Sequence, residues 1–157
     1  VLMLAILLSV ISIFVHPATN ESDEAIFSNS LVSRTTQILL EEYVQDIPNV
    51  RLVSDPAEAD VHVYPKFILY ERFDSGLSFA IFKARNEKVA LTMKIAFIDH
   101  KNDFTQNLTH RSLITKSVRS NFYSMVESEE DFANSLLLNL IKKTVDESFT
   151  EADKLIF

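Results

Sequence analysis

The sequence predicts an α+β domain with a two-layer sandwich, in which two helices pack on one face of a mainly antiparallel sheet of about four strands. Two segments, one toward each end of the chain, carry apolar residues at helical spacing. The segment between them contains strand patterns, one of which alternates strictly between apolar and polar residues. Two layers bury one stripe of each helix and one face of the sheet together.

The first strand is predicted at residues 10–15, which are mostly β-branched or aromatic. Pro17 ends it, because proline cannot donate a hydrogen bond to the ladder. Residues 1–9 have the length and leucine content of a signal-peptide core, without the basic start or the small-residue cleavage site. We interpret residues 1–9 as a signal-peptide remnant or as an extension of the first strand.

A helix of about five turns follows and ends at Pro48. Asp23 and Glu24 lie near its predicted start, where the helix dipole favours acids. Its predicted apolar stripe consists of Phe27, Leu31, Ile38, Leu39, Tyr43 and Ile47. A short strand is then expected at 51–53 and a turn at 55–58.

The next strand is predicted from odd-numbered apolar residues, with a bend at Pro65. These residues are Val61, Val63, Phe67, Leu69 and Phe73. Residues 74–76 are expected to form a turn, and residues 77–87 a loop or hairpin arm.

The clearest strand pattern runs from Val89 to Phe97, with Lys88, Thr92 and Lys94 on the opposite, wet face. Residues 100–103 are predicted to connect a hairpin, and residues 109–119 to form a more polar edge strand.

A second helix closes the fold, with Ser128 as its expected N-cap and acids in its first turn. Its core-facing stripe is predicted to be Ala133, Leu137, Ile141, Val145 and Phe149, flanked by Leu136 and Leu140. Residues 10–150 thus form one domain, and residues 151–157 are interpreted as a C-terminal tail.

Composition excludes several classes of site. Gly76 is the only glycine in 157 residues, so no glycine-rich phosphate loop is possible. Without cysteine there is no disulfide, thiolate metal site or thiol catalysis. The net charge of -7 argues against a nucleic-acid partner, although residues 51–120 hold 11 Lys+Arg against 8 Asp+Glu.

No catalytic or metal site is predicted. His16, His62, His100 and His110 have no spacing typical of metal ligands, and are interpreted as scattered strand and turn residues. A GxSxG nucleophile elbow is impossible with one glycine. The paired acids 41–42 and 129–130 lie on helix surfaces. We therefore predict a protein that is not an enzyme and needs no cofactor.

The candidate binding residues are basic. Lys83, Arg85 and Lys88 lie near Phe79 and Phe82, and cations beside aromatic rings can hold phosphorylated amphiphiles or nucleic-acid strands. Lys94 is added as a candidate because it shares the wet face of the sheet with Lys88. The alternative is a solvated loop whose phenylalanines fold back on the core.

Several short motifs resemble the outer-membrane lipopolysaccharide-assembly lipoproteins, the LptE family. They are Val15-x-Pro17-x-x-Asn20-x-Ser22, the long helix after it, Leu52-Val53-x-Asp55-Pro56-Ala57-x-Ala59-Asp60-Val61, and the alternating strand ending at Asp99. The resemblance covers about residues 10–150, and the turn at 55–60 is its strongest local part.

The resemblance implies a non-enzymatic component of lipopolysaccharide assembly at the periplasmic side of the bacterial outer membrane. Such a protein is a plug or assembly partner of a β-barrel translocon (LptD-like) and contacts lipopolysaccharide. The chain lacks the family's lipidated cysteine, so membrane association is expected through the partner or a missing lipid anchor. Alternatives are another periplasmic interaction module, an auxiliary lipoprotein of a transport system, and a small hydrolase with an unrecognised site.

Overall fold

A computed structural model of the chain describes residues 10–79, 82–119 and 129–151, with side chains at 10–73, 88–115 and 137–149. Residues 1–9, Ser128 and residues 152–157 lie outside these ranges, and so do the predictions made for them. The last helix includes Glu151, which was expected to begin the tail.

One mixed sheet forms the first layer of the fold. Its strand order is β3-β1-β4-β5-β6, and β2 also pairs with β4. The bounds are β1 Ile11–Val15, β2 Thr19–Asn20, β3 Val50–Leu52, β4 Val61–Phe79, β5 Phe82–Asp99 and β6 Phe104–Arg119. Strands β4, β5 and β6 are antiparallel, whereas β1 is parallel to β3 and β4 and β2 is parallel to β4. The α+β class is confirmed, with six strands instead of about four.

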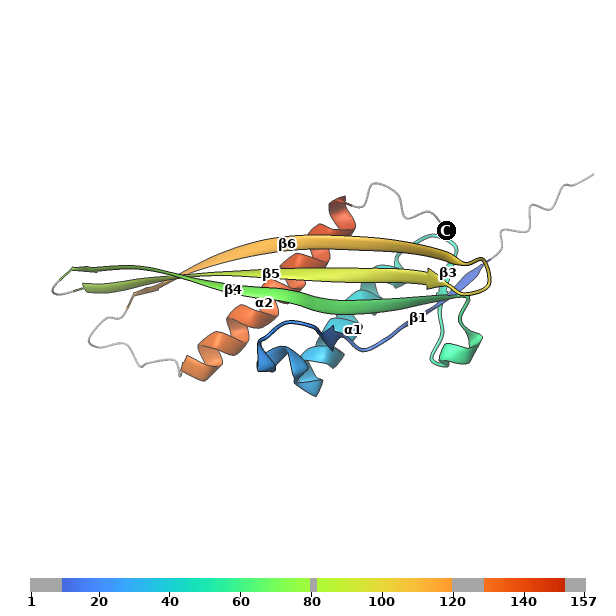
Figure 1. Cartoon of the computed structure of the whole chain (residues 1–157), viewed down its shortest axis with the longest axis horizontal. Helices are drawn as coiled ribbons and strands as arrows, with labels where there is room; N and C mark the ends of the chain where they lie inside the picture. The colour runs from blue at the N-terminus through green and yellow to red at the C-terminus, as the bar shows by residue number, and fades with distance from the viewer. Residues whose placement is uncertain (1–9, 80–81, 120–128, 152–157) are drawn as a thin grey trace, which may run out of the picture.

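Two helices form the second layer, α1 (Ser30–Gln45) and α2 (Glu129–Glu151). Both lie on the same side of the sheet (Figure 1). A 3-10 turn, η1 (Ala25–Ser28), precedes α1, and the Asn29 side chain accepts a hydrogen bond from the Leu31 N–H at 2.8 Å. This cap makes α1 begin later than Asp23 and Glu24 had suggested.

The buried stripe of α1 differs from the predicted one. It consists of Val32, Thr36, Leu40 and Val44, whereas Leu31 is 71% exposed and Ile38 is 45% exposed. Both sets of residues recur at helical spacing, so periodicity alone did not decide between the two faces. In the structure the helix turns the face beginning at Val32 toward the sheet, with Leu39 and Tyr43 partly buried beside it.

Strand β4 changes its inward face in the middle. Phe67 pairs with Met93 and Leu69 pairs with Thr92, so Ile68 is an extra residue in a β-bulge. Before the bulge the odd-numbered residues face the helices, and after it the even-numbered ones do. Leu69 and Phe73, predicted to be buried, are therefore 47% and 40% exposed on the other face.

Beyond the bulge, β4 and β5 continue as one long hairpin. Gly76 pairs with Arg85 and Phe79 with Phe82, so the turn predicted at 74–76 is wrong and the hairpin arm is confirmed. The ends of the two strands extend past α2 (Figure 1). At about 3.3 Å per residue, the 19 residues of β4 span about 60 Å, more than the helix layer covers.

The core lies between the helices and the inward face of the sheet. The odd-numbered residues of β5 from Val89 to Phe97 are buried, as the alternation predicted. From α2, Leu137, Leu140, Ile141 and Val145 meet them, with Phe149 packed at the margin. The predicted stripe of α2 is confirmed at each position whose side chain is described.

Candidate functional site

The face of the sheet turned away from the helices is the candidate site, and we call it the open face. Within the described parts of β4, β5 and β6, it carries His62, Tyr64, Lys66, Leu69, Glu71, Phe73, Lys88, Ala90, Thr92, Lys94, Ala96, Ile98, Thr105, Asn107, Thr109, Arg111, Leu113 and Thr115. These positions follow from strand alternation and from the bulge at Ile68.

Cations predominate on the open face. Its described strand positions include the four cations Lys66, Lys88, Lys94 and Arg111 but only one carboxylate, Glu71. Arg111 Nε is 2.8 Å from Glu71 Oε2. The open face is thus net positive, although the whole chain has a net charge of -7.

Two lysines face each other across β4 and β5. Lys66 is the register partner of Lys94, and like charges at such positions repel. Lys66 Nζ has a partner in Glu21 Oε1 at 3.0 Å. Among the described residues, neither Lys94 nor the exposed Lys88 forms an ion pair, which leaves both available to an anionic ligand.

Apolar side chains lie next to these cations. Phe73 pairs with Lys88, and Leu69 pairs with Thr92, next to Lys94 along β5. The bulge at Ile68 places both apolar residues on the open face, so the surface combines exposed hydrocarbon with positive charge.

The four predicted site residues separate into two groups. Lys88 and Lys94 lie on the open face, as expected. The side chains of Lys83 and Arg85 lie outside the described ones; in the backbone register Lys83 pairs with Ser78 and Arg85 with Gly76. Positions 83 and 85 are odd-numbered, so strand alternation does not place all four positions on one face.

At the other end of the open face, rings from distant segments form a cluster that the sequence did not reveal. His16 Nε2 is 2.9 Å from His62 Nδ1. The His16 ring stacks on Tyr64, with centroids 4.3 Å apart, and Phe14 meets it edge-on at 4.6 Å. The exposed His100 meets His62 edge-on, with centroids 5.2 Å apart. The parallel pairing of β1 with β4 brings Phe14 and His16 to His62, and the antiparallel pairing of β4 with β5 brings His100 there.

Burial, followed by the repulsion of neighbouring histidines, lowers the pKa of His16, and burial and His100 lower the pKa of His62. Both rings are thus held in the neutral form near pH 7. Within the part of the chain that the structure describes, no group of three or more His, Cys, Asp or Glu side chains is arranged to hold a metal ion.

A second polar cluster joins β6 to α2 on the helix side. Glu147 Oε2 accepts a hydrogen bond from Ser112 Oγ at 2.6 Å, and the same oxygen lies 2.6 Å from His110 Nε2. Ser112 is 1% exposed and bonds to the carboxylate instead of the imidazole. A hydrolytic triad needs a serine that is bonded to its histidine and reachable by substrate, so this cluster acts as a clamp between the two layers.

We predict that the clamp makes stability depend on pH. The hydrogen bond from Ser112, followed by that from His110, lowers the pKa of Glu147. A lowered carboxylate pKa adds stability above its unfolded value near 4.5, and this stability is lost as the pH falls through the folded pKa. Glu147→Gln should cost about 1–2 kcal/mol at pH 7 and less at pH 3.5.

Urea unfolding at the two pH values measures this difference. Glu42→Gln is the matched control, because Glu42 is exposed on α1. An equal cost of Glu147→Gln at both pH values would contradict the role of the carboxylate charge.

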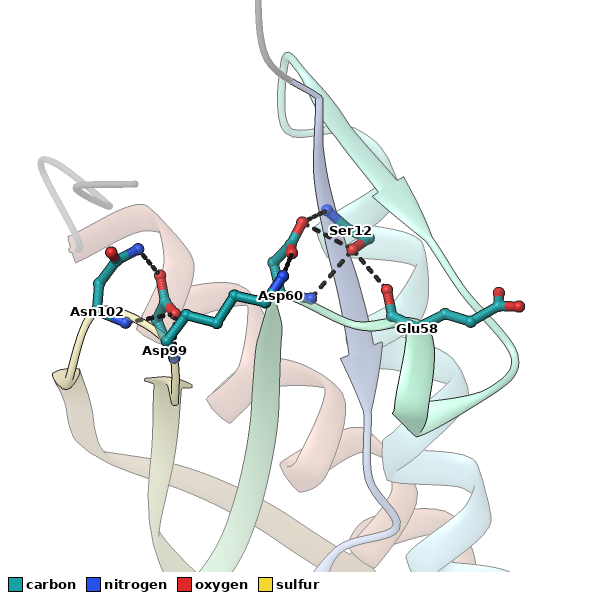
Figure 2. Close-up of polar contacts among 6 residues, drawn as sticks. Ser12, Glu58, Asp60, Asp99 and Asn102 are labelled. Atoms are coloured by element: carbon teal, nitrogen blue, oxygen red, sulfur yellow. Dashed lines mark hydrogen bonds and ion pairs between the residues drawn. The ribbon is translucent and has the colours of Figure 1, made fainter.

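The turn at 55–60 also has a structural role, shown in Figure 2. Asp60 Oδ2 accepts a hydrogen bond from Ser12 N at 3.1 Å. The single hydrogen of the Ser12 hydroxyl has two acceptors within reach, Asp60 Oδ2 and the Glu58 carbonyl, each 2.9 Å from Ser12 Oγ, and Ser12 Oγ itself accepts from Asp60 N at 3.0 Å. Asp55 Oδ1 caps the short helix η2 (Pro56–Glu58) by accepting from Ala57 N at 2.9 Å. The motif that carries the family resemblance therefore fastens a loop to β1.

Among the described residues, no helix is both long enough and apolar enough to span a bilayer.

Comparison with known proteins identifies the fold. No protein-family model matches the sequence, and no curated protein matches it. A putative neuraminyllactose-binding hemagglutinin homolog from Helicobacter pylori has a similar structure, with a TM-score of 0.53 at 12% identity, covering 93% of this chain and 83% of that chain.

Two lipoproteins are more distant in structure. A minor lipoprotein from Acinetobacter baumannii has a TM-score of 0.43 at 13% identity, covering 86% of this chain and 89% of that one. A lipoprotein from Neisseria meningitidis has a TM-score of 0.38 at 14% identity, covering 85% and 99%. At such identities the likeness to the Helicobacter protein shows a shared fold and nothing about activity.

Proposed function

We propose that the chain is a non-enzymatic binding protein of lipopolysaccharide assembly, acting at the periplasmic side of the bacterial outer membrane. The observation that supports the proposal most directly is the open face, where Lys88 and Lys94 lie beside Phe73 and Leu69. The resemblance of the motifs at 15–22 and 52–61 to the LptE family supports the same function.

The chemistry of this surface matches a phosphorylated amphiphile. Lysine ammonium groups form charge-assisted hydrogen bonds with phosphate oxygens. Exposed phenylalanine and leucine side chains gain about 25 cal/mol for each Å² of apolar surface that a hydrocarbon chain covers. Lipopolysaccharide supplies both phosphate groups and acyl chains, so one ligand can satisfy both parts of the open face.

The protein partner in this proposal is an LptD-like β-barrel translocon, for which the chain is a plug or assembly partner. The alternative is an interaction module or auxiliary lipoprotein of a transport system, since two-layer α+β domains serve many functions. Copurification after mild detergent extraction distinguishes them. Recovery with a large β-barrel supports the proposal, and recovery with a transport ATPase complex contradicts it.

We predict that Lys88→Glu/Lys94→Glu weakens binding to lipopolysaccharide about tenfold, which corresponds to about 1.4 kcal/mol. The reason is that two attractive charges become repulsive at the surface that would bind phosphate. Fluorescence titration with purified lipopolysaccharide measures the affinity, and thermal unfolding shows whether the fold is retained.

The control is Arg34→Glu/Lys142→Glu, which changes the net charge equally. Both residues are exposed on the helices, on the other side of the sheet. The control should bind as the original chain does. If both double variants weaken binding equally, total charge is responsible and the open face is not the site.

A further inference from the structure

The hydrogen-bonded histidine pair at the end of the open face has a property that the lysines lack. A single hydrogen links His16 Nε2 and His62 Nδ1 over 2.9 Å, so one nitrogen donates and the other accepts. When both rings are protonated, each nitrogen carries a hydrogen and neither can accept. The two N–H groups then point at each other and repel, so the rings must move apart, and both can donate to an acceptor that enters between them.

We propose that His16 and His62 form an acid-activated subsite for a tetrahedral oxyanion at this end of the open face. One oxygen of a phosphate or sulfate group accepts a hydrogen bond from each protonated ring and replaces the bond between them. The proposal rests on the proposed function for its ligand class. It extends that function, because a second anionic group of the ligand would bind the protonated histidines with an affinity that depends on pH.

The position of the pair suits a ligand that also reaches the lysines. His62, Tyr64 and Lys66 are alternate residues of β4 and share its outward face. Lys66 in turn is the register partner of Lys94. A ligand with two anionic groups can therefore contact the lysines with one group and the histidines with the other.

The other titratable and charged groups around the pair come from every neighbouring segment. Tyr64 stacks on His16, and His100 borders His62 from the β5–β6 connection. Glu21, after β2, is paired with Lys66. The other two nearby carboxylates are Asp60 and Asp99. Asp60 is hydrogen-bonded to Ser12 and to Lys101 Nζ at 3.3 Å, and Asp99 is hydrogen-bonded to Asn102.

Each of these three carboxylates has a partner of its own. Phe14 and Tyr64 contribute only ring contacts to the pair among the contacts described. Protonation therefore gives the pair a positive charge that no described carboxylate contact neutralises, and an external anion can fill that role.

The test uses sulfate alone, because its charge stays constant between pH 5 and 8. For each proton that the protein takes up when sulfate binds, the affinity for sulfate rises by up to about tenfold as the pH falls by one unit within the titration range. We expect sulfate to bind the full chain about tenfold more tightly at pH 5.5 than at pH 7.5. Imidazole NMR signals should show sulfate raising the pKa of His16 and His62, while His110, on the helix side, serves as an internal control.

Two variants test the assignment, His16→Gln and His62→Gln. Each should abolish the pH dependence of sulfate binding, whereas His110→Gln should leave it intact. Where a variant unfolds, the NMR titration of the original chain still decides. Sulfate binding that does not change with pH, or equal shifts at His110, would overturn the subsite.

Separate arms distinguish the subsite from a general surface charge and from the proposed function. The first arm measures binding to vesicles of phosphatidylcholine with phosphatidylglycerol. If binding to these vesicles depends on pH and binding to sulfate does not, the response is electrostatic attraction to a membrane, which contradicts the subsite. If Lys88→Glu/Lys94→Glu does not weaken lipopolysaccharide binding, the proposed function is overturned. The histidine subsite is still decided by the sulfate experiment, which does not depend on that result.

Discussion

Phe67→Ala is expected to lower the free energy of unfolding by about 3–5 kcal/mol, the usual cost of removing a buried phenylalanine ring. Phe67 is 0% exposed and packs against Phe27, with ring centroids 4.7 Å apart. It also lies directly before the bulge, where β4 contacts both the core and the 3-10 turn. Urea unfolding followed by circular dichroism measures the loss.

The matched control is Phe73→Ala on the same strand. If β4 were a regular strand, residues 67 and 73 would share a face and both substitutions would be costly. Because of the bulge, Phe73 is 40% exposed, and its replacement should change stability by less than about 1 kcal/mol. Equal losses in the two variants would contradict the change of face at Ile68.

Asp60→Ala should cost about 1–3 kcal/mol, because it leaves the N–H of Ser12 without its acceptor and leaves the Ser12 hydroxyl only the Glu58 carbonyl. Ser12 is only 5% exposed, so water replaces that acceptor poorly. Thermal and urea unfolding at pH 7 give the loss, with Asp23→Ala at an exposed position as the control.

Asp60→Asn separates hydrogen bonding from charge. The amide oxygen of asparagine can accept both bonds from Ser12 and loses only the ion pair with the exposed Lys101. Exposed ion pairs contribute about 0–1 kcal/mol, so the asparagine variant should retain most of the stability. If asparagine costs as much as alanine, the carboxylate charge is what holds the turn.

The elements were largely predictable from local patterns. Strict alternation from Val89 to Phe97 and the stripe from Leu137 to Val145 each indicated one buried face, and the structure buries both. Where two patterns competed, sequence alone was insufficient. Leu31 and Val32 begin equally spaced stripes on α1, and only packing against the sheet selected the second.

The candidate site was less predictable, because register and bulges decide which side chains share a surface. Lys88 and Lys94 were found from alternation, but Leu69 and Phe73 joined them only through the extra residue Ile68. The meeting of His16 with His62 depends on the pairing of β1 with β4. No local spacing signals such a contact, since 45 residues of intervening chain separate the two rings.

The place of β1 in the sheet also has a consequence for the order of folding. Strands β4, β5 and β6 can pair in sequence order as successive hairpins. Strand β1 must instead enter between β3 and β4, where Ile11 pairs with Val50 and Ile13 with Val61. Closing these long loops costs more entropy than closing a hairpin, and non-local pairing slows folding. During synthesis β1 is made before both of its partners, so its apolar side chains stay unprotected until residue 63 has emerged.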